Sequence, residues 1–408
     1  MKSPLSFCMV TTFYPPYHFG GDAMHVYRLT NELARRGHHV TVLHSVDAYN
    51  ALRNGEARAE FPHEEGVEVH RVRSRLGRLT PLASYLSGRP ALQSGAIETV
   101  LDRDFDVVHF HNVSLIGGPG VLERGGGVKL YTTHEHWLVC PMHVLWKYDR
   151  EPCLAPDCLR CTLAFHRPPQ LWRYGSLMER SLRHVDLFLS PSRFTLQAHR
   201  DRGFDRPIRH LPYFLPSSVG AAPEPSPQAE RERPYFLYVG RLEKLKGLQR
   251  LIERFRGYDH ADLVVAGDGD FGDELRRQAA DVPNVHFLGR VDPPQLPGLY
   301  ANAIALIVPS VGFEVFGIVI LEAFVQRTPV IVHDLGALPE VVEDSAGGLV
   351  YRTQAELLEA MESLRLDPER RRGLGEHGHA AWRALWSEDP HIDQYAAAID
   401  EALALRSS

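Results

Sequence analysis

The sequence predicts an α/β protein with two lobes, each built around a doubly wound parallel sheet. Apolar runs with strand-like spacing alternate with helical spacing in both halves of the 408-residue chain. Loops that contain glycine follow several of these strands, where open α/β sheets bind their ligands. Between the halves, residues 213–234 are rich in Pro, Ser, Ala and Glu, a composition typical of a linker.

The expected domains follow from these boundaries. A chain of this length accommodates two domains of ordinary size. We expect the first domain over residues 1–212, with a cysteine-rich insertion at about 137–170 and a last strand over residues 182–190. After the linker, the second domain would span 235–390, and residues 391–408 would form a terminal helix.

Composition and charge narrow the function classes. No apolar run reaches the ~18 residues of a membrane-spanning helix, and the N-terminus lacks a signal-peptide pattern, so we expect a cytoplasmic protein. Residues 1–216 hold 26 Lys and Arg against 21 Asp and Glu, whereas the whole chain has a formal charge of −6. A basic first half suits an anionic or lipid-linked acceptor and peripheral contact with a membrane, although scattered surface arginines are an equal alternative. No basic and aromatic pattern of a nucleic-acid module is present.

The first βαβ unit runs from a strand at residues 5–12 through a helix at 26–36 to a strand at 39–44. Its loop contains Gly20 and Gly21, beyond the end of the first strand. This position suits ligand binding in a doubly wound sheet. A tight turn that merely requires glycine is the alternative.

Histidines follow two later strands. The strand at residues 106–112 carries His109 and His111, which alternation places on one face, and His134 follows a strand at 130–133. A histidine at the carboxyl end of such a strand points to the ligand-binding edge, so His111 and His134 are candidates. A buried structural histidine is the alternative for each.

Four of the five cysteines lie within 22 residues, with the spacing C-x12-C-x4-C-x2-C: Cys140, Cys153, Cys158 and Cys161. Disulfides are disfavoured in a protein without a signal peptide. Four thiolates suit a structural Zn²⁺. An iron–sulfur cluster or free thiols stay open as alternatives.

The second half opens with a strand at residues 235–239, then Gly240, and a helix at 248–255. Arg241 and Lys246 lie in the loop between them. A guanidinium fork and an ammonium point charge can together neutralise a diphosphate. Two basic residues near a helix start are common, so a solvated surface pair is the alternative.

Two further loops of this half follow strands at residues 263–266 and 285–288. Gly267 and Asp268 follow the first strand, and Arg290 and Val291 follow the second. Their spacing does not match a dinucleotide fingerprint, so alone they are weak indicators of a nucleotide.

The most informative stretch follows an apolar strand at residues 303–308. A loop carries Glu314, and a helix is expected from Phe316 to Ala323, with Glu322 inside it. Free N–H groups and the dipole of a helix N-terminus favour an anion. Carboxylates accept hydrogen bonds from sugar hydroxyls. The alternative is one glutamate that interacts favourably with the dipole at the helix N-terminus and one surface glutamate.

This stretch resembles the E-x7-E motif of retaining, family 4-like glycosyltransferases of the GT-B fold. That superfamily includes glycogen synthases, sucrose synthases and phosphatidylinositol mannosyltransferases. The matching residues are Glu314, Phe316, Gly317 and Glu322, with Pro309-Ser310 before them and Thr328-Pro329-Val330-Ile331 after them.

The resemblance implies two Rossmann-like lobes with a cleft between them. It implies a hexosyltransferase that moves a sugar from a nucleotide-diphosphate sugar on the second lobe to a sugar-bearing acceptor on the first. The terminal helix would pack back on the first domain. No catalytic metal is expected, since the leaving phosphate would help to take the acceptor proton during same-face attack.

The resemblance also implies a role for each candidate residue. Glu314 and His111 would hold the sugar, and Glu322 the ribose. The phosphates would be held by Arg241, Lys246 and the amides near Phe316, Gly317, Ile318 and Val319. The nucleotide and the acceptor border would be lined by Gly20, Gly21, Gly240, Gly267, Asp268, Arg290 and Val291.

Two positions depart from the family pattern. Arg327 and Ala337 stand where the family often has glycine. An arginine in a turn that usually needs a positive φ puts the geometry of that loop in question. Other functions on the same fold also stay open: a glycosyl phosphorylase, an epimerase, or a nucleotide-binding protein with a decayed site.

Overall fold

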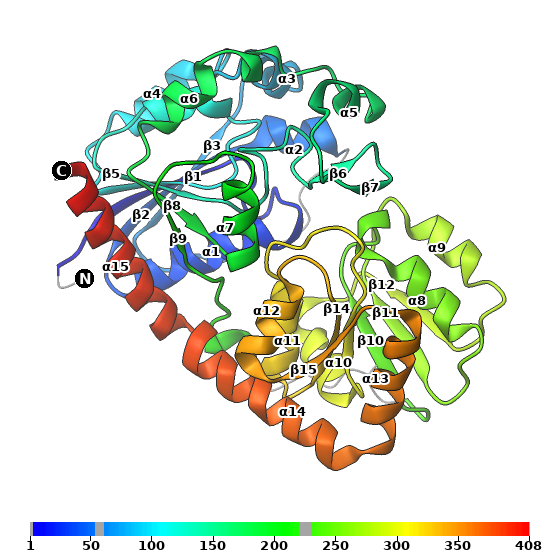
Figure 1. The fold of residues 1–408 in the computed structure, drawn as a ribbon. Helices are drawn as coiled ribbons and strands as arrows, with labels where there is room; N and C mark the ends of the chain where they lie inside the picture. Colours follow the sequence, from blue (N-terminus) through cyan, green and yellow to red (C-terminus); the bar gives the residue numbers. More distant parts are fainter. Residues whose placement is uncertain (1–2, 54–60, 221–230, 408) are drawn as a thin grey trace. The chain divides into compact units, whose positions relative to one another are not determined.

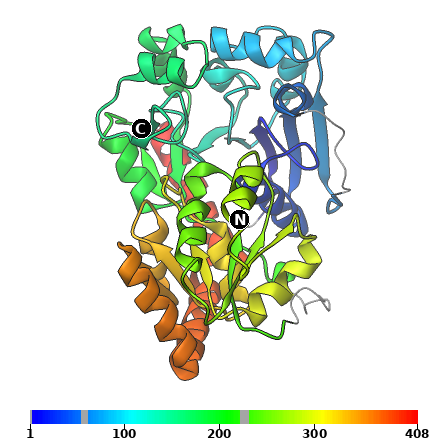
Figure 2. The same cartoon turned by 90° about the vertical axis from the view of Figure 1, so that its right-hand side faces the viewer.

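A computed structural model describes residues 3–53, 61–220 and 231–407 (Figure 1). The chain forms two compact units: unit 1 is Met1–Leu211 with Ile392–Ser408, and unit 2 is Pro212–His391. Part of the predicted linker, residues 221–230, lies outside the described residues. Each unit is built on its own parallel α/β sheet (Figures 1 and 2).

The seven-stranded sheet of unit 1 has the order β3-β2-β1-β4-β5-β8-β9 with every pair parallel. Apolar side chains fill its central strands because helices cover both faces of the sheet. The direction of winding reverses between β1 and β4, which makes their carboxyl ends a topological switch point. The strands are β1 Ser6–Thr11, β2 His39–Ser45, β3 Val67–Val72, β4 Val107–Phe110, β5 Val128–Thr132, β8 Leu187–Ser190 and β9 Ile208–His210.

One helix and one strand of unit 1 begin at other residues than predicted. The first helix begins at Gly20 and not at Val26, so the two glycines form its first turn. The strand predicted over 182–190 begins at Leu187, because a short helix occupies residues up to Leu182. The helices and the short hairpin are α1 Gly20–Arg35, α2 Val46–Leu52, α3 Leu79–Ser87, α4 Ser94–Leu101, η1 Gly118–Glu123, β6 Trp146–Lys147, β7 Glu151–Pro152, α5 Cys158–Ala164, η2 Leu171–Tyr174, α6 Leu177–Leu182 and α7 Arg193–Arg200.

Unit 2 holds a six-stranded parallel sheet in the order β12-β11-β10-β13-β14-β15, with its own reversal between β10 and β13. The predicted strand at 235–239 and helix at 248–255 are confirmed. The strands are β10 Tyr235–Val239, β11 Asp262–Ala266, β12 Val285–Gly289, β13 Leu306–Val308, β14 Val330–His333 and β15 Gly348–Tyr351. The helices are η3 Ser217–Gly220, η4 Lys244–Lys246, α8 Leu248–Phe255, α9 Gly272–Gln278, η5 Pro293–Gln295, α10 Leu296–Asn302, α11 Ile318–Val325, α12 Leu338–Ser345, α13 Gln354–Leu366, α14 Pro368–Ala381 and the π-helical turn Trp382–Trp386.

Two hydrophobic cores lie on the two faces of the unit 2 sheet. Successive residues of a strand point to opposite faces, so Leu237 joins one core while Phe236 and Tyr238 join the other. All three side chains are buried. The sheet is therefore held from both sides, and its carboxyl edge is left to the loops.

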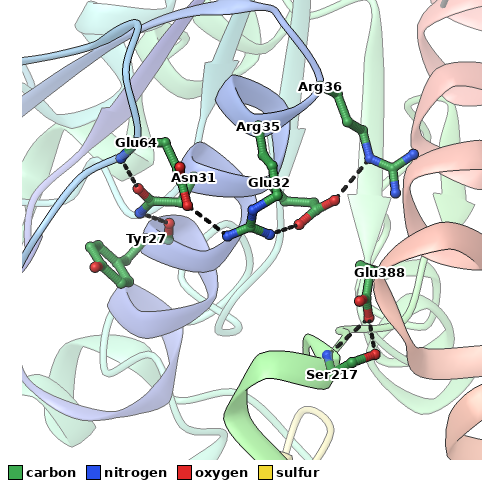
Figure 3. Close-up of polar contacts among 8 residues, drawn as sticks. All are labelled: Tyr27, Asn31, Glu32, Arg35, Arg36, Glu64, Ser217 and Glu388. Carbon is green, nitrogen blue, oxygen red and sulfur yellow. Dashed lines mark hydrogen bonds and ion pairs between the residues drawn. The ribbon is translucent and has the colours of Figure 1, made fainter.

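Polar contacts fix the second half of α1 (Figure 3). The buried carboxylate of Glu32 pairs with Arg35 and, at 2.9 Å, with the Arg36 guanidinium. The amide of Glu64 donates to Asn31 Oδ1 over 2.8 Å. These bonds tie the helix to the segment that leads into β3.

The terminal helix α15, Glu388–Ser407, belongs to both units by sequence. At its start, the Glu388 carboxylate accepts hydrogen bonds from the amide and hydroxyl of Ser217, both at 3.0 Å (Figure 3). From Ile392 onward it packs in unit 1, where the buried Tyr395 hydroxyl lies 2.9 Å from His109 Nδ1.

Candidate active site

The predicted donor residues of unit 2 gather at its topological switch point. The loop after β10 carries Arg241 and Lys246, and the loop after β13 carries Glu314. Because β10 and β13 are adjacent parallel strands, both loops leave the same edge of the sheet. Ligands of open α/β sheets bind at such an edge.

The two loops are joined through their backbones. The amides of Val311 and Gly312 donate to the carbonyl of Leu245 over 2.9 and 3.0 Å. Gly247 has a φ of 74°, and a Cβ there would lie 1.9 Å from the carbonyl oxygen of Pro309. Only glycine allows this conformation and this approach, so Gly247 sets the position of Lys246.

Lys246 and Glu314 form the centre of the site. The Lys246 ammonium donates to both carboxylate oxygens of Glu314, at 2.8 and 3.0 Å. The Ser310 hydroxyl donates to Glu314 Oε1 over 2.6 Å. Both charged side chains keep some access to solvent, 28% for Lys246 and 18% for Glu314.

The electrostatics favour an ionised Glu314. Burial by itself would raise the pKa of this carboxyl group. The Lys246 charge and hydrogen bond, the Ser310 hydroxyl and the charge of Arg241 outweigh burial and lower the pKa below its ordinary value. The Arg241 side chain is half exposed, and its guanidinium lies 2.6 Å from the Glu243 carboxylate in the same loop.

The helix N-terminus also lies at this edge. The helix begins at Ile318, two residues later than predicted, because Gly317 takes a φ of 98°. No side chain in the described part of the chain caps this terminus, so its first-turn amides can meet an anion. Phe316 is buried in the core, so it can contribute its backbone but not its ring. Glu322, one turn inside the helix, accepts a 2.9 Å bond from the Tyr300 hydroxyl.

The loops after β10, β11 and β12 form a continuous backbone layer. The amide of Gly240 donates to Ala266, that of Leu242 to Asp268, and that of Gly267 to Gly289, over 3.1, 3.0 and 2.7 Å. Gly267 has a φ of 150°, and a Cβ there would lie 1.9 Å from the carbonyl oxygen of Gly240. The predicted residues Asp268, Arg290 and Val291 follow in the same loops.

The loop after β14 supports Glu314, a role that the sequence did not indicate. The amide of Ala337 donates to the Glu314 carbonyl over 3.1 Å. Gly336, at a φ of 66°, lies so close that a Cβ would be 3.0 Å from the Glu314 backbone.

Arg327, in the turn before β14, adopts the left-handed conformation expected of glycine, with a φ of 56°, and pairs with Glu376 at 3.1 Å. The departure at Arg327 therefore does not change the course of the turn.

Ser310, Tyr300 and His333 are the contacts that the sequence missed. His333 Nδ1 lies 2.7 Å from the carbonyl oxygen of Ser310. Serine, tyrosine and histidine are too common for any of them to be selected without a partner in space. Only Ser310 had a signal, since it belongs to the stretch that carries Glu314.

In unit 1 the predicted residues lie at the other switch point. Gly20 and Gly21 begin α1 after β1, and His111 follows β4, the neighbouring strand. Gly20 has a φ of 72°, which explains why the turn requires glycine. His109 and His111 lie on one face as predicted, with ring centroids 4.0 Å apart.

His111 is completely buried and pairs with His134. Their Nδ1 and Nε2 atoms lie 2.8 Å apart, and the rings stack at 5.1 Å. Burial and the neighbouring histidines His109, His134 and His25 lower the pKa of His111 well below its ordinary value. Burial lowers the pKa of His134 to about 3. Nε2 of His111 has no hydrogen-bond partner among the described residues, so a neutral imidazole is left with one unused polar atom.

The predicted zinc site finds no support. Cys140, Cys153, Cys158 and Cys161 are all free thiols. Among the residues that the structure describes, no group of three or more His, Cys, Asp or Glu side chains is arranged to hold a metal ion. The thiol of Cys161 instead accepts a 3.4 Å hydrogen bond from the Tyr148 amide. Burial raises the pKa of the other three thiols and so favours their protonated form.

No helix within the described part of the chain combines the length and the apolar character that a bilayer crossing requires.

Comparisons with known proteins agree with this geometry. The family model "Glycosyltransferase Family 4" matches residues 19–216, and "Glycosyl transferases group 1" matches residues 224–381. An uncharacterised glycosyltransferase of Methanocaldococcus jannaschii is 27% identical over 370 residues, which are 85% of this chain and 84% of that protein. The phosphatidyl-myo-inositol mannosyltransferase of Mycobacterium leprae is 34% identical over 160 residues, or 37% of this chain, which spans less than half (42%) of that protein.

Solved structures support the same fold. Sucrose-phosphate synthase from Thermosynechococcus elongatus has a TM-score of 0.73 at 19% identity, over 98% of this chain and 99% of that one. HepE from Anabaena, solved with UDP-glucose, has a TM-score of 0.66 at 18% identity, over 98% and 99%. With two parallel α/β units, and with glycosyltransferase family models on both halves, the chain belongs to the glycosyltransferases of the GT-B fold.

Proposed function

We propose that this glycosyltransferase is a hexosyltransferase that uses a nucleotide-diphosphate sugar and retains the anomeric configuration. The observation that carries the proposal is the Lys246–Glu314 pair at the switch point of unit 2, with the charge of Arg241 acting on the same carboxylate. Two cations and an open helix N-terminus suit a diphosphate. An ionised carboxylate beside them suits sugar hydroxyls.

In this proposal each residue has one task. Arg241, Lys246 and the first amides of α11 stabilise the charge that grows on the leaving diphosphate. Glu314 and His111 bind the sugar, and Glu322 binds the ribose. The layer of loops with Gly240, Gly267, Asp268, Arg290 and Val291 contacts the nucleoside. Gly20 and Gly21 allow the donor phosphates and the acceptor to approach the backbone of unit 1.

The solved neighbour with UDP-glucose supports a nucleotide-sugar donor. A relative whose name includes phosphatidyl-myo-inositol, together with the +5 charge of residues 1–216, supports an acceptor that is anionic or lipid-linked and carries a sugar or polyol. The acceptor would bind unit 1.

A thermal-shift panel of nucleoside diphosphates and nucleotide sugars tests the donor. A ligand that binds only the folded protein raises its apparent stability, by about 2.7 kcal/mol at a concentration 100 times Kd. We expect one base to stabilise the wild type and not the Arg241→Ala variant. The anomeric configuration of the glycoside product, read by NMR, tests retention. No stabilisation by any member of the panel, or an inverted product, would refute the proposal.

A further inference from the structure

The segment that includes the end of β3 and the helix α3 carries arginines on both sides of that helix. Residues 69–97 contain no Asp or Glu, which is unusual in a chain whose net charge is −6. Five arginines of this segment are exposed: Arg71, Arg73, Arg75, Arg78 and Arg89. Arg71 and Arg73 lie over the ring of Tyr17, with 5.9 and 6.0 Å to its centroid. Arg89 pairs with Glu123 at 3.8 Å, and the segment as a whole presents a surplus of positive charge.

The same segment exposes leucines at helical spacing. Leu79, Leu82 and Leu86 are 60%, 46% and 46% exposed and lie three and four residues apart along α3. The opposite face, with Thr80, Ser84 and Tyr85, is buried in unit 1. Two flanking leucines, Leu76 and Leu92, are 52% and 44% exposed. Among the described residues, the helix thus buries one face in unit 1 and leaves its row of leucines exposed.

A neighbouring turn extends this apolar face. In η2, Leu171 and Tyr174 are 70% and 65% exposed. This turn is attached to α3, because Trp172 Nε1 donates to the Tyr85 carbonyl over 2.9 Å and the Tyr85 hydroxyl donates to Pro168 over 3.0 Å. Figures 1 and 2 place α5, with the exposed Leu159 and Leu163, at the same end of the unit. We call the leucines of α3 and its flanks, with Leu171 and Tyr174, the α3 face.

We propose that the α3 face docks on an anionic lipid bilayer. Exposed leucines on a helix that is flanked by arginines suit the interface of a membrane, with the apolar side chains in the acyl boundary and the guanidinium groups at the lipid headgroups. The charge complementarity favours anionic lipid, because each arginine near such a surface adds to the attraction. The nine residues of α3 suit binding at the surface and not crossing. This inference does not depend on the donor chemistry.

Co-sedimentation of the full chain with vesicles tests the proposal. We expect binding to vesicles of equal parts phosphatidylcholine and phosphatidylglycerol, and much weaker binding to phosphatidylcholine alone. Higher salt should weaken the binding as the charges are screened. The variant with Leu79→Glu, Leu82→Glu and Leu86→Glu should bind at least about tenfold more weakly. Arg75→Gln with Arg78→Gln should weaken binding roughly fivefold per arginine, the factor for about 1 kcal/mol.

The control variant carries Leu366→Glu, Leu385→Glu and Leu403→Glu, three leucines that are 66%, 40% and 48% exposed outside the α3 face. Like the α3 leucine variant, it adds three negative charges, but it should bind vesicles as the wild type does. Thermal unfolding of each variant checks that it folds. If the α3 leucine variant does not fold, the variant with Arg75→Gln and Arg78→Gln tests the proposal in its place. Equal binding by wild type and both α3 variants would overturn the proposal. So would a lipid-free dimer that the α3 leucine variant makes monomeric, because a second copy would then cover the face.

Discussion

The ammonium of Lys246 lies 2.8 Å from one carboxylate oxygen of Glu314 and 3.0 Å from the other. The two residues are 68 positions apart in sequence and come from the loops after two adjacent strands. Both side chains are partly shielded from water, so each charge is balanced by the opposite charge of the other residue. A donor diphosphate would compete with Glu314 for the Lys246 ammonium and free the carboxylate for the sugar.

Replacing Glu314 with glutamine keeps the shape of the side chain and removes its charge. We expect kcat to fall roughly 10²–10³-fold, because an amide cannot hold the sugar and balance Lys246 as a carboxylate does. Initial rates with the donor found in the thermal-shift panel measure this. Glu343→Gln, on the exposed side of α12, is the matched control and should keep its rate. A fully active Glu314→Gln variant would exclude Glu314 from the chemistry.

Arg241→Ala should lower kcat roughly 10²–10³-fold if the guanidinium stabilises the departing diphosphate. The half-exposed side chain pairs with Glu243 and supports no core, so the stability against unfolding should change little. Arg256→Ala removes one positive charge from the same unit and serves as the control. Near-normal turnover of the Arg241 variant would overturn its assigned role.

The Glu314 carboxylate should also make stability depend on pH. Its pKa in the folded protein lies below the ordinary 4.5, so the folded state favours the ionised form. The stabilisation is present above about pH 4.5 and is lost as the pH falls through the lower folded value. The difference in melting temperature between wild type and Glu314→Gln should therefore shrink as the pH drops below 4.5. A constant difference down to pH 3 would contradict this.

His44 should also make the stability depend on pH, in a higher pH range than Glu314 does. Burial, with smaller contributions from Arg71 and Arg73, lowers the pKa of His44 from 6.5 to about 3. In the unfolded chain His44 becomes protonated as the pH falls below about 6.5, whereas in the folded protein it stays neutral until about pH 3. The stability against unfolding therefore decreases as the pH drops below 6.5. The loss from this histidine is at most about 1.4 kcal/mol per pH unit.

His44→Phe tests this effect, since His44 lies among aromatic rings and neither ring nitrogen has a hydrogen-bond partner among the described residues. The phenylalanine variant should lose less stability than the wild type between pH 6.5 and pH 5 in denaturant unfolding. Other buried histidines are common to both proteins and cancel in the comparison. Parallel pH curves would show that His44 does not titrate as inferred.

Gly247→Ala should destabilise unit 2 by more than about 1 kcal/mol, because the new Cβ would meet the Pro309 carbonyl at 1.9 Å and the φ of 74° disfavours alanine. The displaced loop should also weaken donor binding, since Lys246 precedes this glycine. Gly257→Ala, where a Cβ would meet nothing within 4 Å, is the control. Urea unfolding of both variants measures the difference, and equal stability would show that the loop yields easily.

Much of the secondary structure could be predicted from local signals. The periodicity of Leu248–Phe255 and the apolar run Tyr235–Val239 predict their elements correctly. The start of α11 was misplaced by two residues, because Gly317 is left-handed and postpones the helix. The strand predicted from Leu182 was too long, since an apolar run has the same appearance at the end of a helix and in a buried strand.

The candidate site was predictable only where charged residues lie within a short, distinctive stretch. Arg241, Lys246, Glu314 and Glu322 were selected that way, and their roles stay predictions. The zinc site was inferred from cysteine spacing alone, and spacing does not determine where thiols point. Gly336 and Tyr300 could not be chosen, because each contacts a glutamate of the site that is distant in sequence. Ser310 lies four residues before its partner Glu314, inside the distinctive stretch.

The sequence by itself determined that the chain alternates strands and helices in two halves and that its charged loops follow buried strands, since periodicity and glycine positions are local properties. Only the tertiary structure decided that Lys246 meets Glu314, that Gly336 and Ala337 contact the same loop, and that the leucines of α3 are exposed among the described residues. The reason is physical: which strands become neighbours, and so which loops share an edge, depends on the order of packing in the whole sheet and not on any single segment.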